Sequence, residues 1–280
     1  MFGQSHRFVV VWATCLLLTA FSFQVVAQSY ASKEGDSISP TFYAKFGYFY
    51  PKFSTSIRLD NEKGRGTEIG LEDELKLSEE LGVFRFDGMI QLSRRSQIVA
   101  SYTYFRRDRT LALERDLTFR DLTLEAGSGV NYKFDVDYIA ATYRHSFFSK
   151  LNWNAGLSAG LRAVFIDTEF NSSVNDFSFR ESASFVAPAL LIGMHGGAYL
   201  TPRLLARYSL ELMYVTISDI DIRVVESNAE VQYFIFDNVG LGLSYSTNLY
   251  RVNQIPFTTR LDGKVNFEFG GLDLFLVIRI

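Results

Sequence analysis

The residues of this sequence that could do chemistry are mainly charged side chains that alternate with apolar ones. A β-strand sends successive side chains to opposite faces, so each charge should point away from its apolar neighbours, into the interior if the strands close into a barrel. The set consists of Lys45, Arg85, Asp87, Lys133, Asp135, Asp137, Arg162, Arg207, Glu211, Glu226, Glu230, Lys264 and Glu268. Spacing alone leaves two interpretations open, a network of ion pairs that plugs the lumen and a narrow polar pore or ligand cavity.

Histidine chemistry has two candidates after residue 27, His145 and His195. Ser146 adjoins His145, but neighbours on a strand point to opposite faces, whereas a base must lie within hydrogen-bond reach of its nucleophile. No histidine pair has metal-ligand spacing, and the single cysteine is Cys15. We therefore predict no catalytic residue, no metal and no cofactor, and we expect a protein that is not an enzyme.

The strands that must position these charges are clearest in segment 151–166, LNWNAGLSAGLRAVFI. Every second residue from Leu151 to Phe165 is apolar, whereas the other face is small or polar from Asn152 to Arg162. A helix, at 100° per residue, would scatter this apolar set around its axis. Since about 9–11 tilted residues cross a bilayer, a strand of this length with one apolar face is typical of a transmembrane β-barrel wall.

The same alternation recurs along residues 41–280 and predicts about ten strands, with eight as the alternative. The expected short connections are 93–96, 148–150, 201–203 and 237–238, and the expected long loops are 59–80, 108–129 and 167–181. Short periplasmic turns and longer outer loops are the usual asymmetry of outer-membrane barrels, and closure removes strand edges that lipid cannot satisfy. We predict an all-β fold, a single closed antiparallel transmembrane barrel. A soluble periplasmic barrel or sandwich is the competing interpretation.

Two local features of the strands are ambiguous. In segment 258–280 the apolar phase shifts by one residue after Gly270 and Gly271. A β-bulge there would restore the facing and is the favoured interpretation; a two-residue hairpin is the alternative. Pro188, with the glycines that follow it, could mark a lateral opening of the wall, but a bend is the more usual reason for such residues.

The N-terminal residues have the composition of an export signal. Arg7 precedes an apolar run from Phe8 to Phe23, and small residues end at Ala27, where we expect cleavage. Residues 1–27 are thus a predicted signal peptide, and the polar residues 28–40 a periplasmic tail. The 15% aromatic content suits interfacial girdles, and the formal net charge of −3 argues against a nucleic-acid partner.

The leader, the amphipathic strands and the apolar last strand together resemble small bacterial outer-membrane barrels of the OmpA/OmpW-like class. This resemblance implies residence in the outer membrane. The partners we expect are outer-membrane lipids, lipopolysaccharide and the assembly machinery, and we expect a monomeric barrel that does not bind nucleic acid. It also implies a C-terminal assembly signal, although the chain ends in Ile280 where Phe or Trp is usual. The corresponding residues are Gly271, Leu272, Leu274, Leu276, Ile278 and Ile280.

We expect a non-enzymatic, structural barrel with a side-chain-filled lumen. Two alternatives stay open, a narrow channel or binding barrel for a small, possibly apolar, molecule, and an outer-membrane enzyme that modifies lipid or peptide through carboxylates.

Overall fold

The computed structural model describes residues 41–59, 68–112, 117–119, 122–124, 127–150, 152–174, 177–217, 220–253 and 263–280. The predicted signal peptide, 1–27, and periplasmic tail, 28–40, lie outside these residues. The described part of the chain contains no helix long and apolar enough to cross a membrane.

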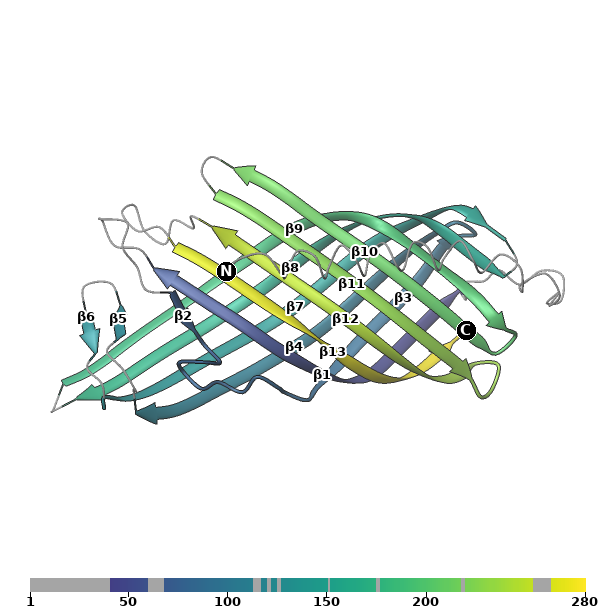
Figure 1. The fold of residues 1–280 in the computed structure, drawn as a ribbon. Coiled ribbons are helices and arrows are strands. Elements are labelled where there is room, and N and C mark those ends of the chain that lie inside the picture. The colour runs from purple at the N-terminus through teal and green to yellow at the C-terminus, as the bar shows by residue number, and fades with distance from the viewer. Residues whose placement is uncertain are drawn as a thin grey trace, which may run out of the picture.

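Ten long strands build the molecule, and three short ones are added to them (Figure 1). The long strands are β1 (Phe42–Leu59), β3 (Val83–Ser93), β4 (Ser96–Ala112), β7 (Gly129–Ser149), β8 (Trp153–Val174), β9 (Phe177–Thr201), β10 (Leu204–Ile217), β11 (Ile220–Phe234), β12 (Val239–Asn253) and β13 (Gly263–Arg279). The short ones are β2 (Glu68–Gly70), β5 (Leu117–Phe119) and β6 (Leu122–Leu124).

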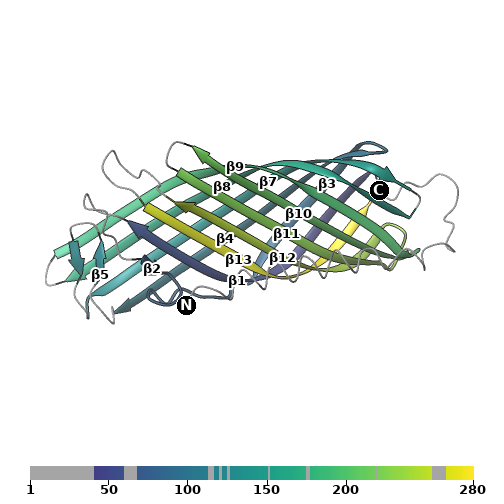
Figure 2. The ribbon, with the colours of Figure 1, turned by 45° about the horizontal axis from the view of Figure 1, so that its top comes forward.

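The long strands pair antiparallel in chain order and close into a barrel, because β13 also pairs with β1 (Figures 1 and 2). This closing pair runs in unbroken register from Tyr43 opposite Arg279 to Leu59 opposite Gly263. The predicted closed antiparallel barrel of about ten strands is confirmed, and the eight-strand alternative is wrong. Short turns join the strands near residues 94, 151, 202 and 237, and we call this end of the barrel the turn end and the opposite end the loop end.

Several strands continue further toward the loop end than the sequence predicts. The predicted loop 167–181 is largely strand, because β8 reaches Val174 and β9 starts at Phe177, with Val174 opposite Phe177. The predicted loop 108–129 likewise begins inside β4 and contains the β5–β6 hairpin. Asp167, for example, is exposed although it lies within β8, so a polar residue there does not mark the start of a loop.

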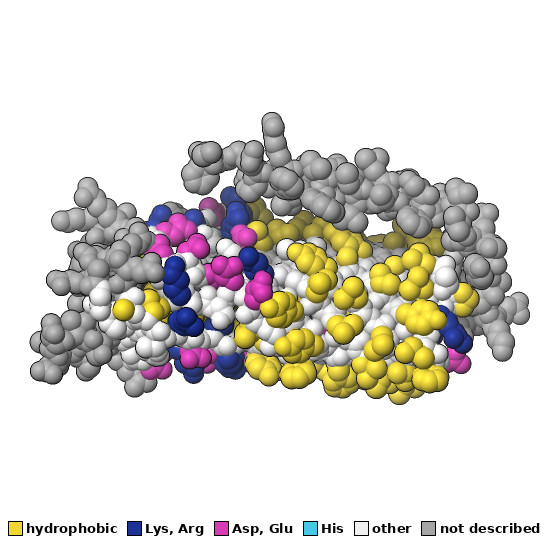
Figure 3. Space-filling model, turned by 60° about the horizontal axis from the view of Figure 1, so that its bottom comes forward, with side chains coloured by type: hydrophobic (Ala, Val, Ile, Leu, Met, Phe, Trp, Pro, Cys, Tyr) yellow, Lys and Arg dark blue, Asp and Glu magenta, His cyan; other side chains and the backbone are white. Residues whose placement is uncertain are grey.

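The outer surface of the barrel is divided into two zones (Figure 3). A belt of exposed apolar side chains covers the turn-end part, with Phe46, Leu161 and Leu274 each more than half exposed. A band of Lys, Arg, Asp and Glu side chains lies beside it on the loop-end side. An exposed apolar surface of this extent is the face that a transmembrane barrel turns to lipid.

The interior changes from polar to apolar at the same height along the barrel at which the outer surface changes from apolar to charged. On β13, Leu272, Leu274 and Leu276 are exposed, whereas Phe267 and Phe269 are 2% and 5% exposed and point inward. The register with β1 continues through Gly270 and Gly271, opposite Lys52 and Pro51, without a bulge or hairpin. The bulge that the sequence favoured is therefore wrong. The apolar residues change face because the loop-end part has water outside and an apolar interior.

Toward the loop end, neighbouring strands of the wall separate from each other at two places. Strands β9 and β10 are paired from Thr201 opposite Leu204 to Ile192 opposite Leu212, and no further pairing between them is found in the described residues. Similarly, β3 pairs with β4 only up to Arg85 opposite Thr103. In Figures 1 and 2, β4, β7, β8 and β9 diverge from β10–β13 and β1 as two groups. Pro188 lies in the separated part of β9, as expected of a proline on a strand edge.

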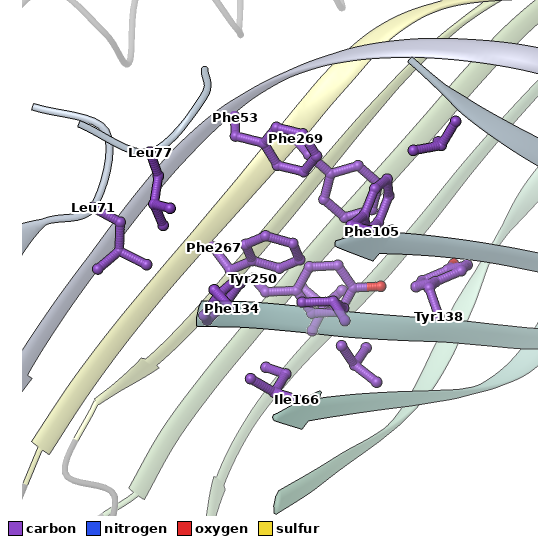
Figure 4. Packing of buried hydrophobic residues seen from close by; sticks show 14 of the residues in the cluster. Phe53, Leu71, Leu77, Phe105, Phe134, Tyr138, Ile166, Tyr250, Phe267 and Phe269 are labelled. Carbon is purple, nitrogen blue, oxygen red and sulfur yellow. The ribbon is translucent and has the colours of Figure 1, made fainter. Parts of the chain in front are cut away.

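An apolar cluster fills the space between these two groups of strands (Figure 4). Phe105 and Phe134 come from β4 and β7, and Phe53, Phe267 and Phe269 come from β1 and β13. The rings of Phe53 and Phe105 meet edge to face with centroids 5.1 Å apart. The segment 71–82, which follows β2, adds three buried leucines, and these are Leu71, Leu75 and Leu77.

Candidate functional site: the charged lumen

The structure divides the predicted lumen charges between the two faces of the wall. Eight point inward, and these are Lys45, Arg85, Asp87, Arg162, Arg207, Glu211, Glu226 and Glu230. The other five lie on the outer face in the charged band, and these are Lys133, Asp135, Asp137, Lys264 and Glu268.

The placement of these five residues corrects the prediction, and β7 shows the physical reason. On this strand Tyr132, Phe134 and Val136 are buried in the apolar cluster, although their spacing seemed to assign them to lipid. Lys133 alternates with them and is half exposed. Where the outer surface meets water instead of lipid, an apolar side chain is more stable inside the barrel than outside it. Alternation therefore shows which residues share a face but not which face is inside.

Arg162 is the centre of one inward group. Its Nε donates to Glu226 Oε2 at 2.8 Å, and a second guanidinium nitrogen bonds to Glu211. The other terminal nitrogen of the guanidinium, Nη1, donates to the Thr142 hydroxyl at 2.9 Å. The hydroxyl groups of Tyr138 and Tyr250 both donate to the other oxygen of Glu226. These bonds use the five donors that the arginine guanidinium holds in a fixed geometry. Through them the group joins β7, β8, β10, β11 and β12 across the lumen.

Lys45 is the centre of the second inward group. Its ammonium lies 2.8 Å from Glu230 Oε2 and 3.4 Å from Asp87 Oδ2. Arg85 contacts the other oxygen of Asp87 at 3.2 Å, and Arg207 lies 3.6 Å from Glu230 Oε1. Since Glu226 and Glu230 both belong to β11, the two groups meet that strand from β8 on one side and β1 on the other.

Glycine makes room for the Arg162 group. A Cβ at Gly160 would lie 2.5 Å from the Arg162 guanidinium and 2.6 Å from the Thr142 hydroxyl. The alternation of Asn154, Gly156, Ser158 and Gly160 with apolar residues, visible in the sequence, is therefore the pattern of a strand whose inner face must stay small opposite a long side chain.

A third buried pair was missed by the sequence analysis. Arg107 of β4 donates to Glu72 at 2.6 Å, and its guanidinium lies 4.3 Å from the ring centre of Phe53. Glu72 Oε2 in turn accepts from the backbone N–H of Thr55. Arg107 alternates with the exposed Tyr104, which could have placed it inward. Glu72 lies in a segment without strand periodicity and gave no signal.

The two histidines lie near the turn end and on opposite faces of the wall. His145 faces outward, where Nδ1 lies 3.0 Å from the Ser96 hydroxyl. His195 is 6% exposed and faces the lumen, where Nε2 lies 3.2 Å from the Ser146 hydroxyl. In the described residues no group of three or more His, Cys, Asp or Glu side chains is placed to hold a metal ion.

A cavity of about 100 Å³ lies among the two charged groups and is lined by members of both. Arg144, His195 and Arg207 line it on the side of β7, β9 and β10, and Lys45 and Asp87 on the side of β1 and β3. The space is polar and is crossed by the ion pairs described above.

The charged band outside the belt is built from exposed pairs. Lys133 lies 2.9 Å from Asp135 and Lys52 lies 2.9 Å from Glu79. In each pair the hydrogen bond to the carboxylate, with its charge, raises the pKa of the lysine above its ordinary value. Ion pairs of lysines that face water contribute little to stability, so the band determines which part of the surface meets water rather than how stable the barrel is.

The sequence matches no protein-family model and no curated protein. Solved structures do resemble the fold. The outer-membrane protease OmpT from Escherichia coli has a TM-score of 0.54 with 11% identity, over 90% of this chain and 99% of that one. The translocator domain of the autotransporter NalP from Neisseria meningitidis has a TM-score of 0.46 with 9% identity, over 96% and 98% of the two chains. The toluene transporter TodX from Pseudomonas putida has a TM-score of 0.32 with 8% identity, over 89% and 91%.

The likeness to OmpT extends over almost the whole of both chains, so the fold is that of an outer-membrane β-barrel. At 11% identity the likeness concerns the fold alone.

Proposed function

We propose that this protein is a non-enzymatic, structural barrel of the outer membrane whose lumen is filled by its own side chains. The observation that carries the proposal is the pair of inward groups centred on Arg162 and Lys45. Both bond to carboxylates of β11 from other sides of the barrel, so a solute on the axis would have to separate buried ion pairs. The apolar cluster closes the loop end as a second seal.

The surface supports the location and the partners. The turn end is then the periplasmic end, and the exposed apolar belt contacts membrane lipids, with lipopolysaccharide at the level of the charged band. The assembly machinery would read β13, where Leu272, Leu274 and Leu276 form the exposed face. Because β1 and β13 close the sheet, a monomer satisfies its own backbone hydrogen bonds within the belt.

The positions of the histidines support a protein without enzymatic activity. Both lie at the turn end, and His145 contacts Ser96 and aromatic rings on the outer face of the wall. Four buried carboxylates of the lumen, those of Asp87, Glu211, Glu226 and Glu230, are engaged by arginine or lysine, which leaves them poor bases. Asp273 of β13 is also buried and forms no ion pair among the described residues.

Fractionation and conductance test this proposal together. The expressed protein should partition with outer membranes and migrate differently on gels before and after heating, as folded barrels do. In a planar bilayer the folded protein should give no stepwise conductance. A soluble protein whose migration does not change on heating, or steady single-channel currents, would each refute the closed barrel.

A second candidate function is the binding of an apolar molecule that enters from the membrane, and the division between β9 and β10 favours it. Leu190 on β9 and Leu212 and Tyr214 on β10 are exposed around the point where the strands separate. Leu191, fully buried in the apolar cluster, lies directly behind them. The backbone N–H and C=O groups of an unpaired strand edge must find partners inside a membrane, or the edge must lie at the membrane boundary. This division is therefore the part of the wall that a molecule from the lipid could pass with least disruption.

A disulfide across the division tests this second candidate. The double variant Ile192→Cys/Leu212→Cys should lock the two strands at their last pair before the division, and the matched variant Leu161→Cys/Leu190→Cys joins β8 and β9, which are paired there. Uptake of a fluorescent apolar probe from lipid vesicles should fall after oxidation of the first variant only. Equal uptake by both oxidised variants would contradict lateral entry.

A further inference from the structure

One side of the lumen contains polar groups without partners; Arg144 and His195 line the cavity there, and Ser158 lies beside it. Arg144 Nε, Ser158 Oγ and His195 Nδ1 are buried and have no hydrogen-bond partner among the described residues. Arg144 on β7 lies opposite Ser158 on β8, and Ser158 lies opposite Gly193, two residues from His195 on β9. The three unpaired groups therefore lie side by side on three neighbouring strands.

All three groups can donate a hydrogen bond. A guanidinium has donors only, and a serine hydroxyl can donate. The His195 ring, when neutral and accepting the Ser146 hydroxyl at Nε2, 3.2 Å away, carries its hydrogen on Nδ1. Buried donors that lack an acceptor are costly, and native structures satisfy nearly all of them with protein, water or ligand. One unpartnered acceptor, Glu211 Oε1, lies across Gly193 from Ser158. Arg144 Nε and His195 Nδ1 are thus the two donors that still call for an acceptor.

The charges of the lumen are unevenly distributed around these groups. Asp87 and Glu230 are engaged by Lys45, and Glu211 and Glu226 by Arg162. In the described chain Arg144 has no carboxylate partner. Arg207, which also lines the cavity, reaches Glu230 only at 3.6 Å. Both arginines act electrostatically on the His195 ring. Arg144 and Arg207 thus bring two positive charges to this side of the lumen, and neither forms an ion pair closer than 3.6 Å among the described residues.

The space is large enough for more than a bound water. The cavity measures about 100 Å³, whereas one water needs about 10–15 Å³ by this kind of measure. Gly193 and Gly197 on β9 make room for side chains of β10, since a Cβ at Gly193 would lie 2.8 Å from Glu211 Cγ and one at Gly197 would lie 3.1 Å from Arg207 Cγ. An arginine fork fits an oxyanion with two parallel hydrogen bonds.

We propose that Arg144, Arg207 and His195, with the Ser158 hydroxyl, bind a small oxyanion of the size of inorganic phosphate in the turn-end half of the lumen. Arg144 supplies charge and donors, Arg207 supplies a second charge, and His195 and Ser158 complete the donor set. The site lies beside the ion-paired groups and does not require the lumen to be open from end to end.

Calorimetric titration of the folded, detergent-solubilised protein with inorganic phosphate tests the proposal. Potassium chloride at matched ionic strength is the reference, because it removes general screening effects. One saturable site is expected for the natural sequence. Arg144→Gln, which keeps the length of the side chain and removes its charge, should weaken phosphate binding by about tenfold or more, about 1.4 kcal/mol. The exposed turn residue Arg94 provides the control, since Arg94→Gln should bind as the natural protein does.

The thermal unfolding midpoint gives a second readout. Phosphate should raise it for the natural protein and for Arg94→Gln, but not for Arg144→Gln. If Arg144→Gln does not fold, Arg207→Gln takes its place with the same expectation. Absence of saturable binding by the natural protein, or equal binding by the Arg144 and Arg94 variants, would overturn the site and leave water as the acceptor. Bilayer conductance is measured separately, so failure here is distinguishable from failure of the closed barrel.

Discussion

Arg162 of β8 and Glu226 of β11 are 64 residues apart in the chain, and Nε and Oε2 meet at 2.8 Å in the lumen. Neither strand pairs with the other, since β9 and β10 lie between them. The contact therefore crosses the interior rather than following the wall. With both side chains 10% exposed or less, the pair depends on its hydrogen bonds to offset the loss of water.

Arg162→Ala should destabilise the barrel and loosen the lumen. It leaves Glu211 and Glu226 in a confined space without their cation, and breaking a buried pair costs about 3–5 kcal/mol, less where water enters. Urea unfolding in detergent should show the loss, and bilayer recordings should show whether ions begin to pass. Arg251→Ala, which removes an exposed pair with Glu268, should change stability by less than about 1 kcal/mol. Equal unfolding midpoints for the two variants would contradict a buried network.

The position of the membrane boundary can be tested on one strand and one face. Phe46 and Ser54 both point outward from β1, the first in the apolar belt and the second beyond it. Phe46→Arg should lower the folded fraction in lipid vesicles, since Arg near the bilayer midplane costs about 2–4 kcal/mol. Ser54→Arg should fold normally because it meets water. If both variants fold equally well, the belt is not the lipid-facing surface.

The sequence predicted the class of fold well, because a period of two persists through every long strand. It could not predict which face is inside, and Lys133 and Phe134 show why. Their alternation is the same whether water lies outside or inside, and only the height of the residue relative to the membrane decides. Leu157 and Leu161, at membrane height, were assigned correctly by the same reasoning that failed for Phe134.

Contacts between distant segments were the other gap. Nothing in the local pattern joins Arg107 to Glu72, since Glu72 lies in a segment that is not a strand. The unpaired donors of Arg144 and His195 were equally hidden, because a missing partner is visible only once the neighbours on β8 and β10 are in place.

The apolar cluster should contribute much of the stability of the loop end. Phe267 is 2% exposed and contacts the rings of Phe53 and Phe134. Phe267→Ala should cost about 3–5 kcal/mol, as buried Phe→Ala changes do, measured by denaturant unfolding. Leu274→Ala, on the same strand but 62% exposed on the outer face, provides the control and should cost much less. If Leu274→Ala were the more costly change, the buried face of β13 would be the one that carries Leu274 and not the one that carries Phe267.

Paired cysteines on β1 and β13 can decide between continuous register and a bulge at Gly270 and Gly271. Tyr48 lies opposite Leu274 below the glycines, and Ser54 lies opposite Glu268 above them. Residues directly opposite on antiparallel strands have Cα atoms about 4.5–5.5 Å apart, within the range a disulfide spans. The only cysteine of the chain, Cys15, lies in the predicted leader, so the background is clean.

Both double variants, Tyr48→Cys/Leu274→Cys and Ser54→Cys/Glu268→Cys, should form disulfides on mild oxidation, seen as a change in gel migration that reductant reverses. A bulge would shift the partner of Ser54 by one residue and turn the Glu268 side chain to the other face. The Ser54→Cys/Phe269→Cys variant is the matched control and should stay reduced, because residue 269 points into the lumen. A disulfide in this control, with none between positions 54 and 268, would restore the bulge and return Phe267 and Phe269 to the outer face.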